Sequence, residues 1–117
     1  MTYVDGFIVA VSNDKKGEYA KFSEIAGAAF KKHGALRLVE CCGEDVPDGE
    51  VTSFPMAVKK QENETVWFSW IEWPSKKVRD EAMPKVMAEE SVKAMEDDIP
   101  FDGKRMIFGG FDKIVDM

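Results

Sequence analysis

The chain has 117 residues, 44% of them hydrophobic, and its 22 acidic against 16 basic residues give a formal net charge of −6. A chain of this length and composition normally folds around one core, so we expect a single domain over residues 1–117. The acidic balance argues against a nucleic-acid-binding protein, which needs a basic surface to replace phosphate counterions.

The first two predicted elements are a strand and a helix. Residues 3–11 form a short apolar run rich in β-branched and aromatic side chains, which is typical of a strand. A cluster of helix-capping residues occupies 12–14. Beyond it, apolar residues recur at three- and four-residue steps as far as His33, which predicts an amphipathic helix that Gly34 ends.

A second strand and an irregular insertion follow. Residues 35–42 have the composition of a strand, and residues 43–53 are rich in turn-forming side chains. Residues 54–58 fit a short extended segment. Because Pro55 cannot donate to a sheet ladder, this segment is expected at an edge or in an irregular position.

The strongest strand signal is the sequence TVWFSWIEW at residues 65–73. Ser75 then has the side chain and position of a helix N-cap. Within that second helix, Pro84 lacks an amide hydrogen and clashes with the preceding turn. We therefore expect either a kink at Pro84 or a break, with a new helix running from there to about Met95.

The last predicted element is a strand over residues 104–115, in which Gly109 and Gly110 indicate a bulge or a close backbone approach. The element order is therefore β-α-β-β-α-β, with an irregular insertion between the second and third strands. This is the order of the split βαβ, ferredoxin-like motif. We predict an α+β fold in which helices cover one face of an antiparallel sheet.

Both faces of the predicted sheet are apolar, whereas a sheet with one wet face should alternate apolar and polar residues. In the third strand, Phe68 and Trp70 lie on one face, and Trp67 and Ile71 lie on the other. Two helices can cover only one face of the sheet. If the other face were exposed, its apolar area would far exceed the roughly few hundred Å² that is usual for an apolar patch on a monomer. We therefore expect a homodimer in which the second faces of two copies pack together.

Several kinds of site and location are disfavoured. No apolar run approaches the roughly 20 residues of a membrane-spanning helix, and the N-terminus lacks the features of a signal peptide. The adjacent Cys41 and Cys42 would have to distort a strand to form a disulfide, so we expect reduced thiols packed as small apolar groups, and a cytoplasmic location.

Because His33 is the one histidine, a site needing two imidazoles is excluded within one chain, and a haem would have one obvious ligand. We expect no metal and no cofactor.

Polar residues within the apolar strands are the candidates for chemistry. A charge in such a position is paired, lies near a strand end, or belongs to a site. For catalysis we select Asp5 or Glu72 as the acid/base group, and Arg105 as the stabiliser of an anion through its planar donor fork. Ion pairing is the structural alternative, since Arg37 and Glu72 lie on strands expected to be neighbours. The full set is Asp5, Arg37, Glu40, Ser69, Glu72 and Arg105.

Three residues form the predicted ligand-binding set. Trp70, at the middle of its strand, could wall a pocket for a planar organic molecule, although packing in a core or dimer would also explain an aromatic residue there. Arg37 and Cys41 on the neighbouring strand complete the set. A nucleophilic role for Cys41 would need an activating base, and none stands near it in the sequence.

Five segments in this order carry a family resemblance: YVDGF near the start, LVEC in the second strand, DVPDG in the loop, FSWIE in the third strand and PFDGKRMIFGGF at the end. In these segments the chain resembles the YbaA family of small bacterial proteins, a family of unknown function in the dimeric α/β-barrel superfamily. The resemblance spans almost the whole chain. It implies a ferredoxin-like protomer and a homodimer with facing sheets, and it implies no activity.

Two functions from different classes fit these observations. The first is a cytoplasmic homodimer that binds a small, partly apolar organic molecule between sheet and helices, with any catalysis cofactor-free and of the monooxygenase or isomerase type. The second is a non-catalytic dimeric interaction or stress-related module, whose polar residues only fix the interface. An enclosed pocket beside Trp70 and Arg105 would favour the first, and a filled core with every strand charge paired would favour the second.

Overall fold

The computed structural model describes residues 2–117, which contain four strands and four α-helical segments. No helix in this described part is both long enough and apolar enough to cross a membrane. In chain order the elements are β1 (Tyr3–Ser12), a 3₁₀ turn (Asn13–Lys15), α1 (Lys16–Lys32), β2 (Arg37–Cys42), α2 (Phe54–Ala57), β3 (Glu64–Trp73), α3 (Lys76–Met87), α4 (Glu90–Lys93) and β4 (Ile107–Asp112).

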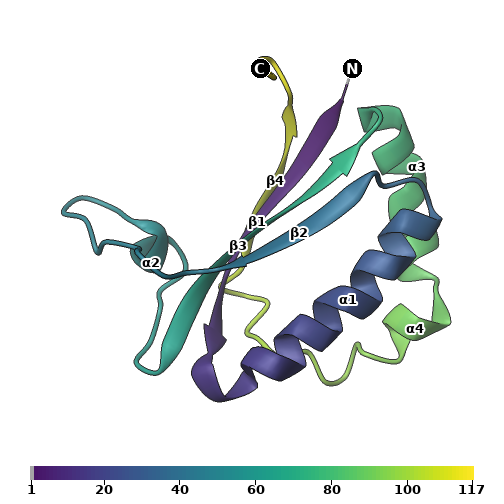
Figure 1. Cartoon of the computed structure of the whole chain (residues 1–117). Coiled ribbons are helices and arrows are strands. Elements are labelled where there is room, and N and C mark those ends of the chain that lie inside the picture. The colour runs from purple at the N-terminus through teal and green to yellow at the C-terminus, as the bar shows by residue number, and fades with distance from the viewer. Residues whose placement is uncertain (1) are drawn as a thin grey trace.

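The strands form one antiparallel sheet in the order β2-β3-β1-β4. The central pair, β1 and β3, is in register from Tyr3 opposite Trp73 to Ser12 opposite Glu64. Helices α1, α3 and α4 lie on one side of this sheet, while α2 projects with its loop at the far end of the strands (Figure 1). The predicted α+β, ferredoxin-like architecture is therefore confirmed.

Local signals explain where the long helices begin and end. Gly34 follows α1 with a φ of +116°, a conformation that glycine adopts without strain. The Ser75 side chain accepts a hydrogen bond of 3.2 Å from the amide of Val78, as expected for the N-cap of α3. Of the two alternatives predicted at Pro84, a kink or a break, the break is wrong, because α3 continues through Pro84 to Met87. Pro84 is exposed, so water can satisfy the carbonyl that loses its helical partner.

The segment expected to be extended at 54–58 is instead the short helix α2, so that prediction is also wrong. The Ser53 hydroxyl accepts a hydrogen bond of 3.1 Å from the amide of Met56 and caps the turn. Pro55 occupies the first turn of the helix, where a missing amide hydrogen costs nothing. Local capping therefore outweighed the apolar composition of this segment.

The last strand is shorter than predicted and starts at Ile107. Residues before it form a turn in which the Asp102 carboxylate accepts a hydrogen bond of 3.0 Å from the amide of Lys104. No bulge interrupts the register of β4 against β1. Gly110 is instead a close approach, since a Cβ atom there would collide with the Tyr3 hydroxyl and the Arg79 guanidinium.

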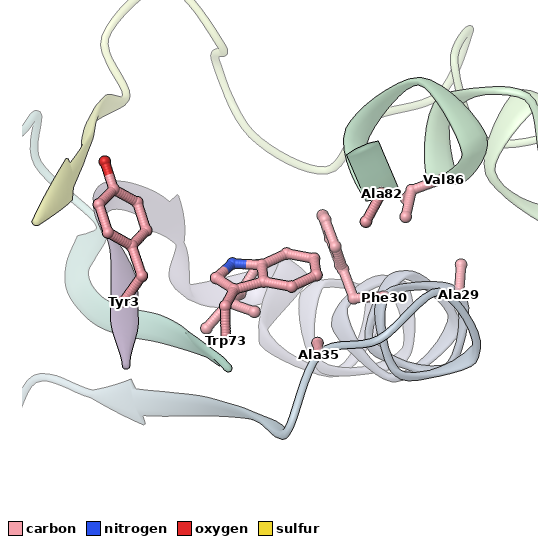
Figure 2. Close-up of a cluster of buried hydrophobic side chains, with 8 residues drawn as sticks. Tyr3, Ala29, Phe30, Ala35, Trp73, Ala82 and Val86 are labelled. Carbon is pink, nitrogen blue, oxygen red and sulfur yellow. The ribbon is translucent and has the colours of Figure 1, made fainter. Parts of the chain in front are cut away.

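The main core lies between the sheet and the long helices. Figure 2 shows the Trp73 indole reaching from β3 toward Phe30 of α1, with Ala82 and Val86 of α3 beyond that ring. The Trp73 and Phe30 rings meet edge to face at 6.0 Å. Trp73 and Val86 are fully buried. This cluster fixes α1 and α3 on the sheet and so sets the distance between the helices and the sheet.

The second face of the sheet is covered at one end only. Val58, which follows α2, packs there on Ala10 and Val66, and all three are buried. The predicted irregular insertion thus supplies a lid for part of the second face. Elsewhere on this face Phe68 and Phe111 remain 44% and 61% exposed.

Candidate functional site

A cavity of about 210 Å³ lies between the sheet and the helices. Helices α1, α3 and α4, strands β1–β3 and the connection 94–106 all contribute to its walls. The walls are largely aromatic, aliphatic and methionine side chains, and Glu40 is the one charged residue among them. Its aromatic lining residues are Phe7, Tyr19, Phe22, Phe30, Trp70 and Phe101.

Two hydroxyl groups of α1 bind the carboxylate of Glu40. The Tyr19 hydroxyl donates to Oε1 and the Ser23 hydroxyl donates to Oε2, each at 3.0 Å. Tyr19 and Ser23 lie one helical turn apart on α1 and therefore share its sheet-facing side. Ser69 stands opposite Glu40 in the β2–β3 register, and its hydroxyl lowers the pKa of Glu40.

Burial raises the pKa of Glu40, because the carboxylate loses water and its charged form is penalised. Hydrogen bonds from Tyr19, Ser23 and Ser69 act in the opposite direction but do not cancel the effect. The pKa of Tyr19 is raised by its own burial and by the neighbouring Glu40 charge. Tyr19 is therefore a neutral donor at physiological pH, and Glu40 is the group in this cluster that can exchange a proton.

Tyr19 is held in place by neighbouring rings. Its ring packs edge to face against Trp67 of β3 at 4.9 Å and against Phe101 at 5.7 Å. Phe22, which stacks near it on α1, also meets Phe101 edge to face. The hydroxyl is thus aimed at Glu40 by a rigid aromatic cluster and not by the hydrogen bond alone.

An open groove of about 530 Å³ runs along the outside of α1 and β2. Ser23, Leu38 and Glu40 line both this groove and the inner cavity. Gly27 and Ala28 of α1 leave the groove open, since neither has a bulky side chain that would fill it. Glu40 therefore lies between an apolar interior and solvent, where it can exchange protons with water.

Asp5, a predicted catalytic residue, is buried and fully engaged. The Trp73 indole Nε1 donates to its Oδ2 at 2.9 Å, and the Arg79 guanidinium pairs with its Oδ1 at 3.2 Å. Burial raises the pKa of Asp5, and these two partners lower it. Asp5 does not line the cavity.

Glu72 lies on the second face of the sheet, away from the helices. It stands opposite Val4 in the register, whereas Asp5 is the next residue along β1 and points to the other face. Glu72 pairs with Arg37 at 3.4 Å and accepts a hydrogen bond of 2.9 Å from the Trp70 indole. The structure therefore shows the ion pair between Arg37 and Glu72 that the sequence offered as the alternative to a site.

Arg105 is held in an ion-pair network. Its guanidinium binds the Glu64 carboxylate in a bidentate manner at 2.9 and 2.8 Å, and it contacts Asp102 at 3.0 Å. The structure therefore does not bring Arg105 together with Asp5 or Glu72. Cys41 and Cys42 have free thiols but are exposed, so the expected apolar packing of these residues is wrong.

Tyr19 and Ser23 were missed as members of a site, and Glu40 and Ser69 were singled out only as polar residues within apolar strands. A detectable signal existed in the helix, where Tyr19 and Ser23 share the apolar stripe that must face the sheet. A polar pair on that stripe requires a polar partner on a strand.

A second hollow, of about 610 Å³, lies on the uncovered face of the sheet. Gly6 and Gly109 leave its floor open, and Phe68 and Phe111 form part of its walls. Trp70 lines this hollow as well as the inner cavity.

A family model described as "Protein of unknown function (DUF1428)" matches residues 2–103. The chain belongs to the DUF1428 family. The uncharacterized protein YbaA of Escherichia coli K12 is 58% identical to it over 116 residues, which cover 99% of each chain. A YbaA protein of Shigella flexneri matches to the same extent. The resemblance seen in the sequence is therefore confirmed for this DUF1428 protein.

Solved structures similar to this DUF1428 protein share its fold. A putative antibiotic biosynthesis monooxygenase from Nitrosomonas europaea has a TM-score of 0.63 at 10% identity, covering 97% of this chain and 90% of that one. SnoaB, a cofactor-independent oxygenase from Streptomyces nogalater, has a TM-score of 0.57 at 14% identity, covering 99% and 94%. At such identities the likeness shows the fold alone.

Proposed function

We propose that this DUF1428 protein binds a small, partly apolar organic molecule in the inner cavity, where Glu40 accepts a proton from it in a cofactor-free reaction. The observation that carries the proposal is the Glu40 carboxylate, which faces an apolar cavity and is held there by Tyr19 and Ser23. The shared fold with a cofactor-independent oxygenase supports the proposal by analogy.

Glu40 suits the role of a general base. Its raised pKa brings the carboxylate closer to the physiological range, where a base combines adequate strength with an ionised form. The proton moves from a carbon or oxygen atom of the ligand to Glu40, and negative charge develops at the ligand atom that loses the proton. Protonated Glu40 is a weaker hydrogen-bond acceptor, so the hydroxyls of Tyr19 and Ser23 can turn to the new negative charge.

The same deprotonated ligand can lead to two classes of product. Return of the proton from Glu40 to a different ligand atom completes an isomerisation without another reactant. Transfer of an electron from the deprotonated ligand to dioxygen begins an oxygenation, with dioxygen as the oxidant. Both outcomes start with proton abstraction at Glu40, so this step is the one to measure.

Deuterium exchange in D₂O tests proton abstraction directly. A panel of small ketones and aminoketones with single-ring or short-chain bodies is incubated with the purified protein, without added metal or cofactor, and followed by NMR. We expect the protein to accelerate loss of the proton beside the carbonyl of at least one compound, and Glu40→Gln to abolish the acceleration. Glu62→Gln, at an exposed position, is the matched control. Absence of both exchange and ligand-induced shifts at the cavity across the panel would overturn the proposal.

A non-catalytic dimeric module is the second candidate function. Its supporting observation is that both Glu40 oxygens already accept hydroxyl hydrogen bonds, as in a purely structural cluster. In that case the cluster only ties α1 to the sheet. Glu40→Gln would then change the stability of the protein, and neither the wild type nor the variant would accelerate deuterium exchange.

We infer in addition that two copies pack through the uncovered second faces of their sheets. Exposed Phe68, Ile107 and Phe111 support this, because burying them removes a contiguous apolar patch from water. Light scattering at micromolar concentration should give twice the chain mass of 13.2 kDa. Phe68→Lys should dissociate the pair, while Val51→Lys, in the exposed loop, should not. A wild-type monomer under these conditions would exclude the dimer.

A further inference from the structure

Glu40 differs from the other carboxylates on β1, β2 and β3 in its lack of a cationic partner. In the described residues 2–117, no lysine, arginine or histidine stands within ion-pair distance of this part-buried carboxylate, whereas the fully buried Asp5 is paired. Lys31 borders the outer groove with Glu40 but does not line the inner cavity. The paired carboxylates on these strands are Asp5 with Arg79, Glu64 with Arg105, and Glu72 with Arg37.

The lining of the cavity favours positive charge in a second way. Tyr19, Phe22 and Phe101 all line it: the rings of Tyr19 and Phe22 lie nearly parallel, and Phe101 meets both edge to face, with centroids 5.7 Å and 5.5 Å away. The faces of such rings attract cations through their quadrupole. Methionine side chains at 95 and 106 add polarizable surface beside the rings. An anion would meet the Glu40 carboxylate with no compensating cation.

We infer that the cavity selects a small organic cation, a protonated amine on a single ring or short apolar chain. The ammonium group would supply the missing half of an ion pair at Glu40, and the apolar body would lie against the aromatic rings. Each Glu40 oxygen accepts one hydroxyl hydrogen bond and retains a lone pair for the ammonium. The cavity, at about 210 Å³, is smaller than the sites of drug-sized ligands, which limits the ligand to this size.

This inference rests on the proposed ligand site and names the chemical class that the site takes. Three probes of nearly equal shape separate charge from size: benzylammonium, benzyl alcohol and benzoate. Their dissociation constants are measured by NMR titration of the full chain at constant pH and ionic strength. We expect benzylammonium to bind at least about tenfold more tightly than benzyl alcohol, which corresponds to about 1.4 kcal/mol, and benzoate to bind most weakly.

The variants test whether Glu40 is the source of that ranking. Glu40→Gln should reduce the ratio between benzylammonium and benzyl alcohol to about one, while Glu62→Gln should leave it unchanged. The wild-type ranking is decisive even if Glu40→Gln fails to fold. Equal or tighter binding of benzyl alcohol, tighter binding of benzoate, or no binding of any probe at the cavity would overturn the inference. Binding of benzyl alcohol alone would leave the proposed ligand site standing, so the two failures are distinguishable.

Discussion

The hydroxyl of Tyr19 donates a hydrogen bond of 3.0 Å to Oε1 of Glu40 and thereby joins helix α1 to strand β2. Ser23, one turn further along the helix, binds the other carboxylate oxygen. Because both donors come from one helix face and the acceptor comes from an edge strand, the cluster reports directly on how α1 sits on the sheet. It is also the point where an apolar cavity meets a proton-exchanging group.

Replacement of Tyr19 by Phe keeps the ring packing and removes the donor to Glu40. We expect a loss of about 1.5–3 kcal/mol in the free energy of unfolding, as for a hydrogen bond to a charged group. The pKa of Glu40 should rise further, because the Tyr19 hydrogen bond lowers it. Urea denaturation and carboxyl ¹³C NMR titration measure the two effects. In a Glu40→Gln background the stability loss should shrink, and an unchanged Glu40 pKa would contradict the interpretation.

The raised pKa of Glu40 predicts a pH-dependent stability difference between the wild type and Glu40→Gln. The folded protein binds this proton more tightly than the unfolded chain, whose carboxyl has the ordinary pKa of 4.5. The stabilisation from Glu40 is therefore complete below that value and is lost as pH rises through the folded pKa. We expect the stability of Glu40→Gln relative to wild type to increase with pH, by no more than about 1.4 kcal/mol per pH unit. Urea denaturation over a pH series would refute this if the difference stayed constant.

Replacement of Arg105 by Ala should destabilise the fold by about 2–3 kcal/mol, because it leaves the largely buried Glu64 without its bidentate partner. Arg105 lowers the pKa of Glu64 below the ordinary 4.5. The stabilisation is therefore present above that value and is lost as pH falls through the folded pKa. Denaturation at neutral and acidic pH should show the difference between the proteins shrinking in acid. Lys104→Ala, exposed beside it, should behave like wild type.

Of two glycine variants, one should destabilise the fold and the other should leave its stability nearly unchanged. Gly110→Ala places a methyl group against the Tyr3 hydroxyl and the Arg79 guanidinium, so β4 must shift on β1. Overpacking of this kind typically costs about 1–3 kcal/mol. Gly103→Ala meets no atom within 4 Å and should be close to neutral. Thermal and urea denaturation of the two variants checks the contrast, and equal stabilities would show that β4 tolerates the added group.

Local patterns in the sequence were sufficient for the element order and the fold class. Ser75 and Gly34 mark helix ends because capping and positive φ involve only a few neighbouring residues. Apolar residues on both faces of TVWFSWIEW predicted a sheet with two apolar faces, and burial of the second face by another copy stays a prediction, since Phe68 there is 44% exposed. The local patterns misled at Pro55, which fits the first turn of α2, and the predicted alternative of a break at Pro84 was wrong, because proline is compatible with the exposed side of α3.

The composition of the candidate site depended on contacts between residues distant in the chain. Glu40 meets Tyr19 and Ser23 across 21 and 17 positions, and Arg105 meets Glu64 across 41. A strand charge by itself does not reveal which face it occupies relative to the helices, since one step along the pleat reverses it. Sequence patterns could therefore nominate polar residues in apolar strands. Only the strand register and the seating of α1 on the sheet decided that Arg105 and Glu72 are paired elsewhere and that Glu40 faces the cavity.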